Sequence, residues 1–223
     1  MSRPSIDSQR LSPEVLFDLD GTLANLPTSV FGKMTKAGLT SVLGGPRFIR
    51  GLESTGVEIG PIASRRPELR RGVTERFVTR AGLSQWFGNV EDVQLCGNLS
   101  PRNFGQSERD KARVVHAHAY DRAVGMIEDK PNKLGAELLD LLATLAAPKP
   151  ILLGAVGPDA ERRTIALINS SVAKQFDITP TQEGALFEMG QATLEVVAIP
   201  KMDYYSGQNF GEHLLHYARQ DVA

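Results

Sequence analysis

A short apolar run that leads directly into two closely spaced aspartates is the feature that most constrains the fold of this chain. Residues 15–17 are Val-Leu-Phe, and Asp18, Asp20, Gly21 and Thr22 follow at once. A continuous apolar run of this length is typical of a strand that is buried on both faces, as in parallel sheets. Ligands bind outside the carboxyl ends of such strands, and two like charges this close require a divalent cation or a shared proton. We therefore expect a functional site where this strand ends.

Predicted strands and helices alternate along the rest of the chain. Apolar segments predict further strands at residues 57–63, 93–96, 124–127, 151–153 and 194–199. Helical signals follow these strands. The first predicted helix has Pro67 at its first position and ends at Gly82, and the second covers residues 108–122 and is opened by a capping box at residues 107–110. Further helices are predicted over the Leu-rich residues 133–145, after a cap at Asp159, and near residues 211–218. This alternation predicts the α/β class, with a Rossmann-like, doubly wound parallel sheet.

Charge and composition exclude several classes of protein. The formal net charge is −1, which argues against the binding of polyanions through bulk charge. Cys96 is the single cysteine, so an intramolecular disulfide is impossible and a reducing compartment is expected. No apolar run is long enough to cross a bilayer, and residues 1–10 are polar, so we expect a cytoplasmic protein that does not bind a membrane.

More polar residues fall at the ends of the predicted strands. Ser64 closes the second strand, Glu128 and Asp129 follow the fourth, and Lys111 lies near the start of the preceding helix. Carboxyl ends of parallel strands meet along one edge, so these side chains are expected to converge. Taken in chain order with the aspartate segment, they resemble the four motifs of the haloacid-dehalogenase-like (HAD) phosphohydrolases: a DxDGT segment, a Ser or Thr, a Lys or Arg, and an acidic pair. The resemblance covers roughly residues 15–130.

The resemblance implies a Mg²⁺-dependent phosphatase that hydrolyses a phosphomonoester. Asp18 would be the nucleophile and would form an aspartyl-phosphate intermediate, a known mode of carboxylate catalysis. Asp20 would protonate the leaving oxygen and then deprotonate the attacking water. Dehalogenases of the same superfamily are similar but generally lack the second aspartate, so Asp20 favours phosphate chemistry.

The implied cofactor is Mg²⁺, which prefers oxygen ligands. The resemblance assigns these ligands to the Asp18 carboxylate, the Asp20 backbone carbonyl and an acid of the pair formed by Glu128 and Asp129. The family pattern usually has an aspartate or a Gly-Asp run where Glu128 stands. Which of the two acids contacts the metal directly is therefore an open alternative.

The implied phosphate-binding residues are Thr22, Ser64 and Lys111, which offer hydrogen bonds or positive charge to phosphate oxygens. Ser64 has an alternative role as the cap of the helix predicted after it. Lys111 has the alternative of being an exposed lysine in the first turn of its helix, with Arg109 or Arg113 in its place at the site.

Two arginines after Ser64 are candidate substrate-binding residues. Arg65 and Arg66 would grip a second phosphate, a nucleotide or a nucleic-acid end, as arginines beside phosphate sites do. The alternative is a solvated helix face whose charge is balanced by Glu68 and Glu75.

A single HAD-like domain is expected over residues 1–223, because no convincing boundary divides the chain. Residues 14–130 carry the four motifs, residues 24–55 are too short for a separate domain and supply a flap or minimal cap, and residues 131–223 supply the remaining strands and helices. The expected partner is a phosphorylated small molecule, nucleotide or oligonucleotide end, and a homo-oligomer is compatible with the sequence. The alternatives are a non-catalytic HAD-fold binding or regulatory protein and a phosphotransferase.

Overall fold

The computed structural model describes residues 11–23, 46–68, 71–97, 104–145, 149–199 and 204–220. The strands are β1 (Glu14–Phe17), β2 (Glu58–Pro67), β3 (Val93–Gly97), β4 (Val124–Glu128), β5 (Ile151–Ala155), β6 (Asp177–Pro180), β7 (Gly184–Met189) and β8 (Ala192–Ala198). The helices are α2 (Pro46–Glu53), α3 (Arg71–Arg80), α4 (Ser84–Phe87), α5 (Phe104–His118), α6 (Pro131–Thr144), α7 (Ala160–Ile168) and α8 (Tyr204–Gln220), with a 3₁₀ turn η3 (Ala173–Gln175) before β6.

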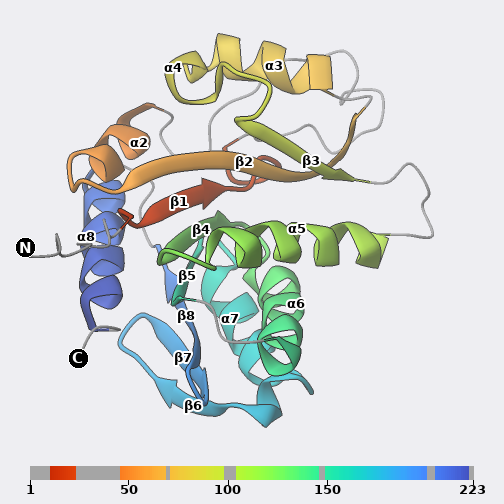
Figure 1. Ribbon diagram of the computed structural model, residues 1–223, viewed down its shortest axis with the longest axis vertical. Coiled ribbons are helices and arrows are strands. Elements are labelled where there is room, and N and C mark those ends of the chain that lie inside the picture. The colour runs from red at the N-terminus through yellow and green to blue at the C-terminus, as the bar shows by residue number, and fades with distance from the viewer. Residues whose placement is uncertain are drawn as a thin grey trace, which may run out of the picture.

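The described strands form one eight-stranded sheet in the order β3-β2-β1-β4-β5-β8-β7-β6 (Figure 1). Strand β1 lies inside it and pairs in parallel with β2 and β4, with Phe17 opposite Ile62 on one side and Ile127 on the other. The pairs β2–β3, β4–β5 and β5–β8 are also parallel. This confirms the predicted α/β class, and each of the six predicted strands corresponds to an observed one. The sheet is mostly parallel, which is consistent with the predicted Rossmann-like fold.

The end of the sheet beyond β8 departs from the prediction. Strand β7 is antiparallel to both β8 and β6, so strands do not alternate with helices from end to end. The β7–β8 connection is a tight hairpin in which Gly190 has a φ of +63°, a conformation that glycine adopts without strain. Strands β6 and β7 are not predicted by the sequence patterns; β6 is short and mostly exposed, which leaves little apolar signal.

The core has two layers, one on each face of the sheet. Val15 and Phe17 belong to the buried cluster that includes residues of α2, α3, α4 and α8, whereas Leu16 belongs to the cluster that includes residues of α5, α6 and α7. All three side chains are fully buried. The continuous apolar run of β1 is therefore explained by burial on both faces.

Several helix boundaries differ from those predicted, and the last helix, expected near residues 211–218, spans Tyr204–Gln220. Pro67 belongs to β2, and the following helix α3 begins at Arg71 instead, because β2 continues along β3 as far as Gly97. Helix α5 begins at Phe104 and ends at His118, so the residues of the expected capping box lie inside the helix rather than at its start. Asp159 is at the N-cap of α7 as predicted, but its carboxylate makes no capping hydrogen bond.

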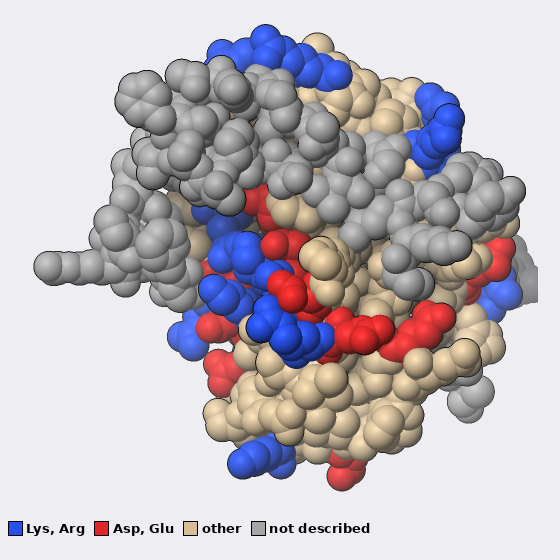
Figure 2. Space-filling view, turned by 180° about the vertical axis from the view of Figure 1, so that it is seen from behind, with Lys and Arg blue, Asp and Glu red and all other residues tan. Residues whose placement is uncertain are grey.

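The predicted flap over residues 24–55 lies mostly outside the described residues, since residues 24–45 are not among them. Its last part forms α2, which lies beside α8 (Figure 1) and buries Phe48, Ile49 and Leu52. Among the described helices, none has the length and apolar character needed to cross a membrane. On the face seen in Figure 2, basic and acidic side chains are interspersed, so neither sign of charge dominates it.

Candidate active site

Asp18 lies at the carboxyl end of β1, where the chain leaves the sheet. Its backbone N–H donates to the carbonyl of Ile127 in β4 at 2.9 Å, and its side chain is 1% exposed. Gly21 then turns the chain with a φ of +91°, and a Cβ added there would lie 2.5 Å from Oδ2 of Asp129. Only glycine fits this turn, because both the backbone conformation and the close approach exclude a side chain.

Lys111 connects the ends of β1 and β4. Its Nζ lies 2.7 Å from Oδ1 of Asp18 and also donates a hydrogen bond to Oε2 of Glu128. The lysine is completely buried, so the alternative of an exposed lysine is wrong. Arg109 and Arg113 are not substitutes for it, because they form ion pairs with acids on the outside of α5 and α6. Three elements, β1, α5 and β4, thus bring their charged groups to one point.

Burial and mutual repulsion set the protonation of these acids. Burial, with the nearby charge of Glu128, raises the pKa of Asp18 to about 7, although the Lys111 ammonium acts in the opposite direction. Burial also acts to raise the pKa of Glu128, but Lys111 outweighs it and holds that pKa at about 2. The pKa of Lys111 is raised because the two carboxylates outweigh its own burial. Glu128 and Lys111 are therefore charged at neutral pH.

The two acids that end β4 have different surroundings. Both oxygens of Glu128 are occupied, Oε2 by Lys111 and Oε1 by the backbone N–H of Lys130 at 2.8 Å. Asp129 contacts the Lys130 ammonium through Oδ2 at 3.2 Å, whereas its Oδ1 is buried without a hydrogen-bond partner among the described residues. Burial and the charge of Glu128 raise the pKa of Asp129. Asp129 is thus the acid with an oxygen left over for a ligand.

Carboxylate oxygens of Asp18, Glu128 and Asp129 all lie within 4.8 Å of one another, so this acidic cluster could hold a metal ion. Three buried or half-buried acids at this spacing repel one another, and an unpaired buried oxygen is costly. A hard cation that prefers oxygen ligands would offset both costs. Asp20 follows at the same strand end and its side chain is partly exposed.

Thr22 and Ser64 are buried hydroxyls near this point. The hydroxyl of Thr22 donates to Oδ2 of Asp18 at 3.4 Å. Ser64 lies in β2, next to β1, and is completely buried. Its Oγ has no hydrogen-bond partner in the described part of the chain, so it does not cap α3, the first described α-helix after it. A buried hydroxyl without a partner is a group available to a ligand.

Arg65 forms an ion pair with Glu108 of α5, with Nε 3.0 Å from Oε2. Burial alone would lower the pKa of Arg65, but Glu108 and the acids of the cluster raise it, which shows that its guanidinium lies within their field. The alternative of a solvated helix face is wrong for Arg65, because it is a strand residue and its side chain is mostly buried. The side chain of Arg66 is outside the described residues. Glu68 pairs instead with Arg71 on the surface.

Two residues near the cluster were not predicted from the sequence. The sequence pattern predicts a capping role for Glu108, whereas the structure places it inside α5, where it pairs with Arg65. Arg163 of α7 donates to the backbone carbonyl of Asp129 and borders a cavity of about 300 Å³ together with Gly21 and Asp129. No sequence pattern pairs Arg163 with Asp129, because the contact follows from the parallel pairing of β4 with β5.

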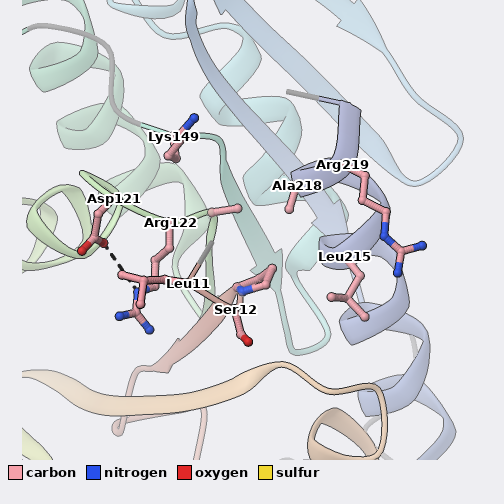
Figure 3. A pocket seen from close by; sticks show the side chains of 10 residues that line it. Leu11, Ser12, Asp121, Arg122, Lys149, Leu215, Ala218 and Arg219 are labelled. Atoms are coloured by element: carbon pink, nitrogen blue, oxygen red, sulfur yellow. Dashed lines mark ion pairs between the residues drawn. The ribbon is translucent and has the colours of Figure 1, made fainter. Parts of the chain in front are cut away.

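A larger hollow, of about 400 Å³, lies at the opposite edge of the sheet, between the segment before β1, the start of β4 and the end of α8 (Figure 3). Its basic side chains do not converge. Arg122 is paired with Asp121, with 3.5 Å between Nε and Oδ1, while Lys149 and Arg219 point in other directions (Figure 3). The hollow is remote from the acidic cluster, because it is formed where the parallel strands begin and not where they end.

Comparison with known proteins provides no relative from which a role could be transferred: no protein-family model, curated protein or solved structure matches this chain. The function of the chain is therefore inferred from the geometry of its strand ends.

Proposed function

We propose that the chain is a Mg²⁺-dependent phosphomonoesterase of the HAD type, with Asp18 as its nucleophile. The observation that carries this proposal is the completely buried Lys111, which bridges Asp18 and Glu128 beside the free oxygen of Asp129. A lysine and three acids from separate elements are costly to bury together, since each ion loses its hydration. Phosphoryl transfer would account for this arrangement, because that reaction depends on a positioned nucleophile and on charges around the phosphate.

The residues present suit a magnesium ion. The carboxylates of Asp18 and Asp129 and the backbone carbonyl of Asp20 would hold it, which are oxygen ligands of the kind that Mg²⁺ prefers. Of the two acids that end β4, Asp129 is the better metal ligand, because its Oδ1 has no partner among the described residues whereas both oxygens of Glu128 accept hydrogen bonds. The ion would supply positive charge that keeps Asp18 ionised and offsets its repulsion from the substrate phosphate.

Asp18 and Asp20 would carry out the chemical steps of the reaction. An Asp18 oxygen attacks phosphorus and the P–O bond to the leaving group breaks, with Asp20 giving its proton to the leaving oxygen. Asp20 then takes a proton from water, whose oxygen attacks the aspartyl-phosphate, releases inorganic phosphate and regenerates the Asp18 carboxylate. Lys111 and Thr22 orient Asp18, since they contact its Oδ1 and Oδ2 at 2.7 and 3.4 Å.

Three groups are suited to hold the phosphate. An ammonium has three N–H donors, and Asp18 and Glu128 use two of those of Lys111, which leaves one for a phosphate oxygen. The Ser64 hydroxyl lacks a partner in the described residues and would donate to another oxygen. Arg65 lies in the field of the same acids and would meet a further phosphate or the rest of the substrate.

The substrate class follows from the small size of the segment that could cover the site. If residues 24–55 supply only a minimal cap, the site stays open to a bulky phosphate ester. A nucleotide or nucleic-acid end is the first candidate, with sugar phosphates and phosphoproteins behind it, because Arg65 offers a guanidinium beside the site. A cover provided by a second copy of the chain is compatible with this arrangement.

The experiment measures phosphate release from an aryl phosphate with Mg²⁺. Activity should disappear with EDTA and with Asp18→Asn, and it should persist with Asp140→Asn, a matched change on the exposed part of α6. Activity that survives both EDTA and Asp18→Asn would contradict the proposal. A panel of nucleotides, 3′- and 5′-phosphorylated oligonucleotides and sugar phosphates would then identify the preferred ester. Transfer to an added alcohol in excess of hydrolysis would indicate a phosphotransferase.

A further inference from the structure

The guanidinium of Arg163 joins α7 to the acid that ends β4. Its Nη1 donates to the backbone carbonyl of Asp129 and lies 3.5 Å from Oδ2 of the same residue. Its Nη2 lies 3.5 Å from Oδ2 of Asp159, at the start of α7. One planar group therefore contacts both the backbone and the side chain of Asp129, while Asp159 holds its other end.

Besides Arg163, the surroundings of Asp129 include a glycine, a partly exposed lysine and the neighbouring acid Glu128. Gly21 approaches its carboxylate and carries no side chain to pack against it. The other cation on the carboxylate is Lys130, whose side chain is 31% exposed and flexible. Oδ1 is buried and has no protein partner among the described residues. The carboxylate whose Oδ1 lacks a partner is thus contacted by Arg163, which also holds the backbone of the same residue.

We propose that Arg163 is a positioning residue of the metal site, which fixes the Asp129 peptide and carboxylate so that Oδ1 faces the bound cation. This inference rests on the proposed function in that it takes Asp129 as a metal ligand. Groups that hydrogen-bond to metal ligands fix their orientation, and removing one typically weakens metal binding by about 10–100-fold. It also gives α7, a helix outside the four motifs, a role in the site.

The neighbouring arginine is a matched control. Arg162 lies on the same helix and pairs with Oδ1 of Asp159 at 3.1 Å, but its side chain is 78% exposed and the described contacts do not connect it to Asp129. Arg162→Gln removes the same charge from the same acid as Arg163→Gln does, and leaves Asp129 untouched. Arg163→Lys keeps a donor for the backbone carbonyl but loses the planar fork that also reaches the carboxylate.

Mg²⁺ and Mn²⁺ binding to the metal-free full-length chain, measured by calorimetry, tests the proposal. Arg163→Gln should weaken binding by about tenfold or more, Arg163→Lys should recover part of the loss, and Arg162→Gln should bind like the wild type. The rise in melting temperature on adding metal, compared with each variant's own metal-free protein, should follow the same order. This second readout separates positioning from a general loss of stability. A general loss lowers the melting temperature with and without metal alike, so it cancels in the difference.

Equal metal affinity in Arg163→Gln and the wild type would overturn the positioning role and leave the proposed function standing. An equal loss of metal affinity in Arg162→Gln and Arg163→Gln would also overturn the positioning role, because the loss would then follow from the change in overall charge. A wild-type chain that binds neither metal would overturn both the positioning role and the metal site of the proposed function.

Discussion

Removing the charge of Lys111 should destabilise the metal-free protein more than the loss of any surface ion pair. At 2.7 Å from Oδ1 of Asp18, and with an effective dielectric constant of about 20, its ammonium attracts that carboxylate by about 6 kcal/mol. Lys111→Met avoids the cost of burying the ammonium, which is several kcal/mol, but leaves the buried carboxylates of Asp18 and Glu128 without the cation that pairs with both. We expect the free energy of unfolding to fall by about 3–5 kcal/mol, as it does when other buried ion pairs are broken. Methionine fills a similar volume, so a cavity does not contribute.

Urea unfolding at neutral pH without metal measures this loss, with Lys130→Met as the control. The Lys130 ammonium is partly exposed and lies 3.2 Å from Asp129, so its removal should cost about 0–1 kcal/mol.

The loss should also depend on pH, because it arises from two buried carboxylates. In the wild type Lys111 lowers the pKa of Glu128 to about 2, so this acid stabilises the fold above its ordinary pKa of 4.5. Without Lys111, burial raises the pKa of both acids above their unfolded values. The folded variant therefore takes up protons as the pH falls, and its loss in free energy of unfolding relative to the wild type becomes smaller. A deficit below about 1 kcal/mol, or one that is the same at pH 5 and pH 8, would refute the reasoning.

Three further predictions concern the rest of the site and the far side of the sheet. Asp129→Asn should weaken Mg²⁺ binding more than Glu128→Gln does, since only Asp129 has a free oxygen; calorimetry that finds equal effects would contradict this. Gly21→Ala should cost about 1–3 kcal/mol in thermal or urea unfolding, because a φ of +91° and a contact of 2.5 Å with Asp129 both oppose a side chain. The hydrogen bond from His213 to Glu195 raises the pKa of that histidine, so its contribution is complete below the ordinary pKa of 6.5 and is lost as the pH rises through the raised pKa. His213→Gln should therefore destabilise the protein at acidic pH and have little effect in alkaline buffer.

The strands that carry the site could be predicted because they are buried on both faces and have strong apolar signals. Residues 15–17 and 124–127 are uniformly apolar, and the structure buries β1 and β4 inside the sheet. Parallel pairing then brings Asp18, Glu128 and Asp129 to one edge by geometry alone. The helix boundaries around them could not be predicted as well, since β2 runs through Pro67 by pairing with β3, and tertiary pairing overrides a local signal.

Contacts between elements far apart in the sequence were beyond the reach of pattern arguments. Arg163 meets Asp129 only because β5 pairs with β4 and α7 follows β5, and Glu108 meets Arg65 only because α5 packs beside β2. The partition of roles between Glu128 and Asp129 was left open for the same reason. It depends on which oxygens Lys111 and the Lys130 backbone occupy, and the sequence does not contain that information.

The most direct test of the account is to look for phosphate on Asp18. The wild-type chain is mixed with a phosphate ester and Mg²⁺, quenched in acid during turnover, digested and analysed by mass spectrometry. The account predicts that the peptide containing Asp18 gains the mass of one phosphoryl group, that hydroxylamine removes it, and that Asp18→Asn shows no such adduct. Rapid hydrolysis of the ester with no adduct on Asp18, and with unchanged turnover in Asp18→Asn, would contradict it.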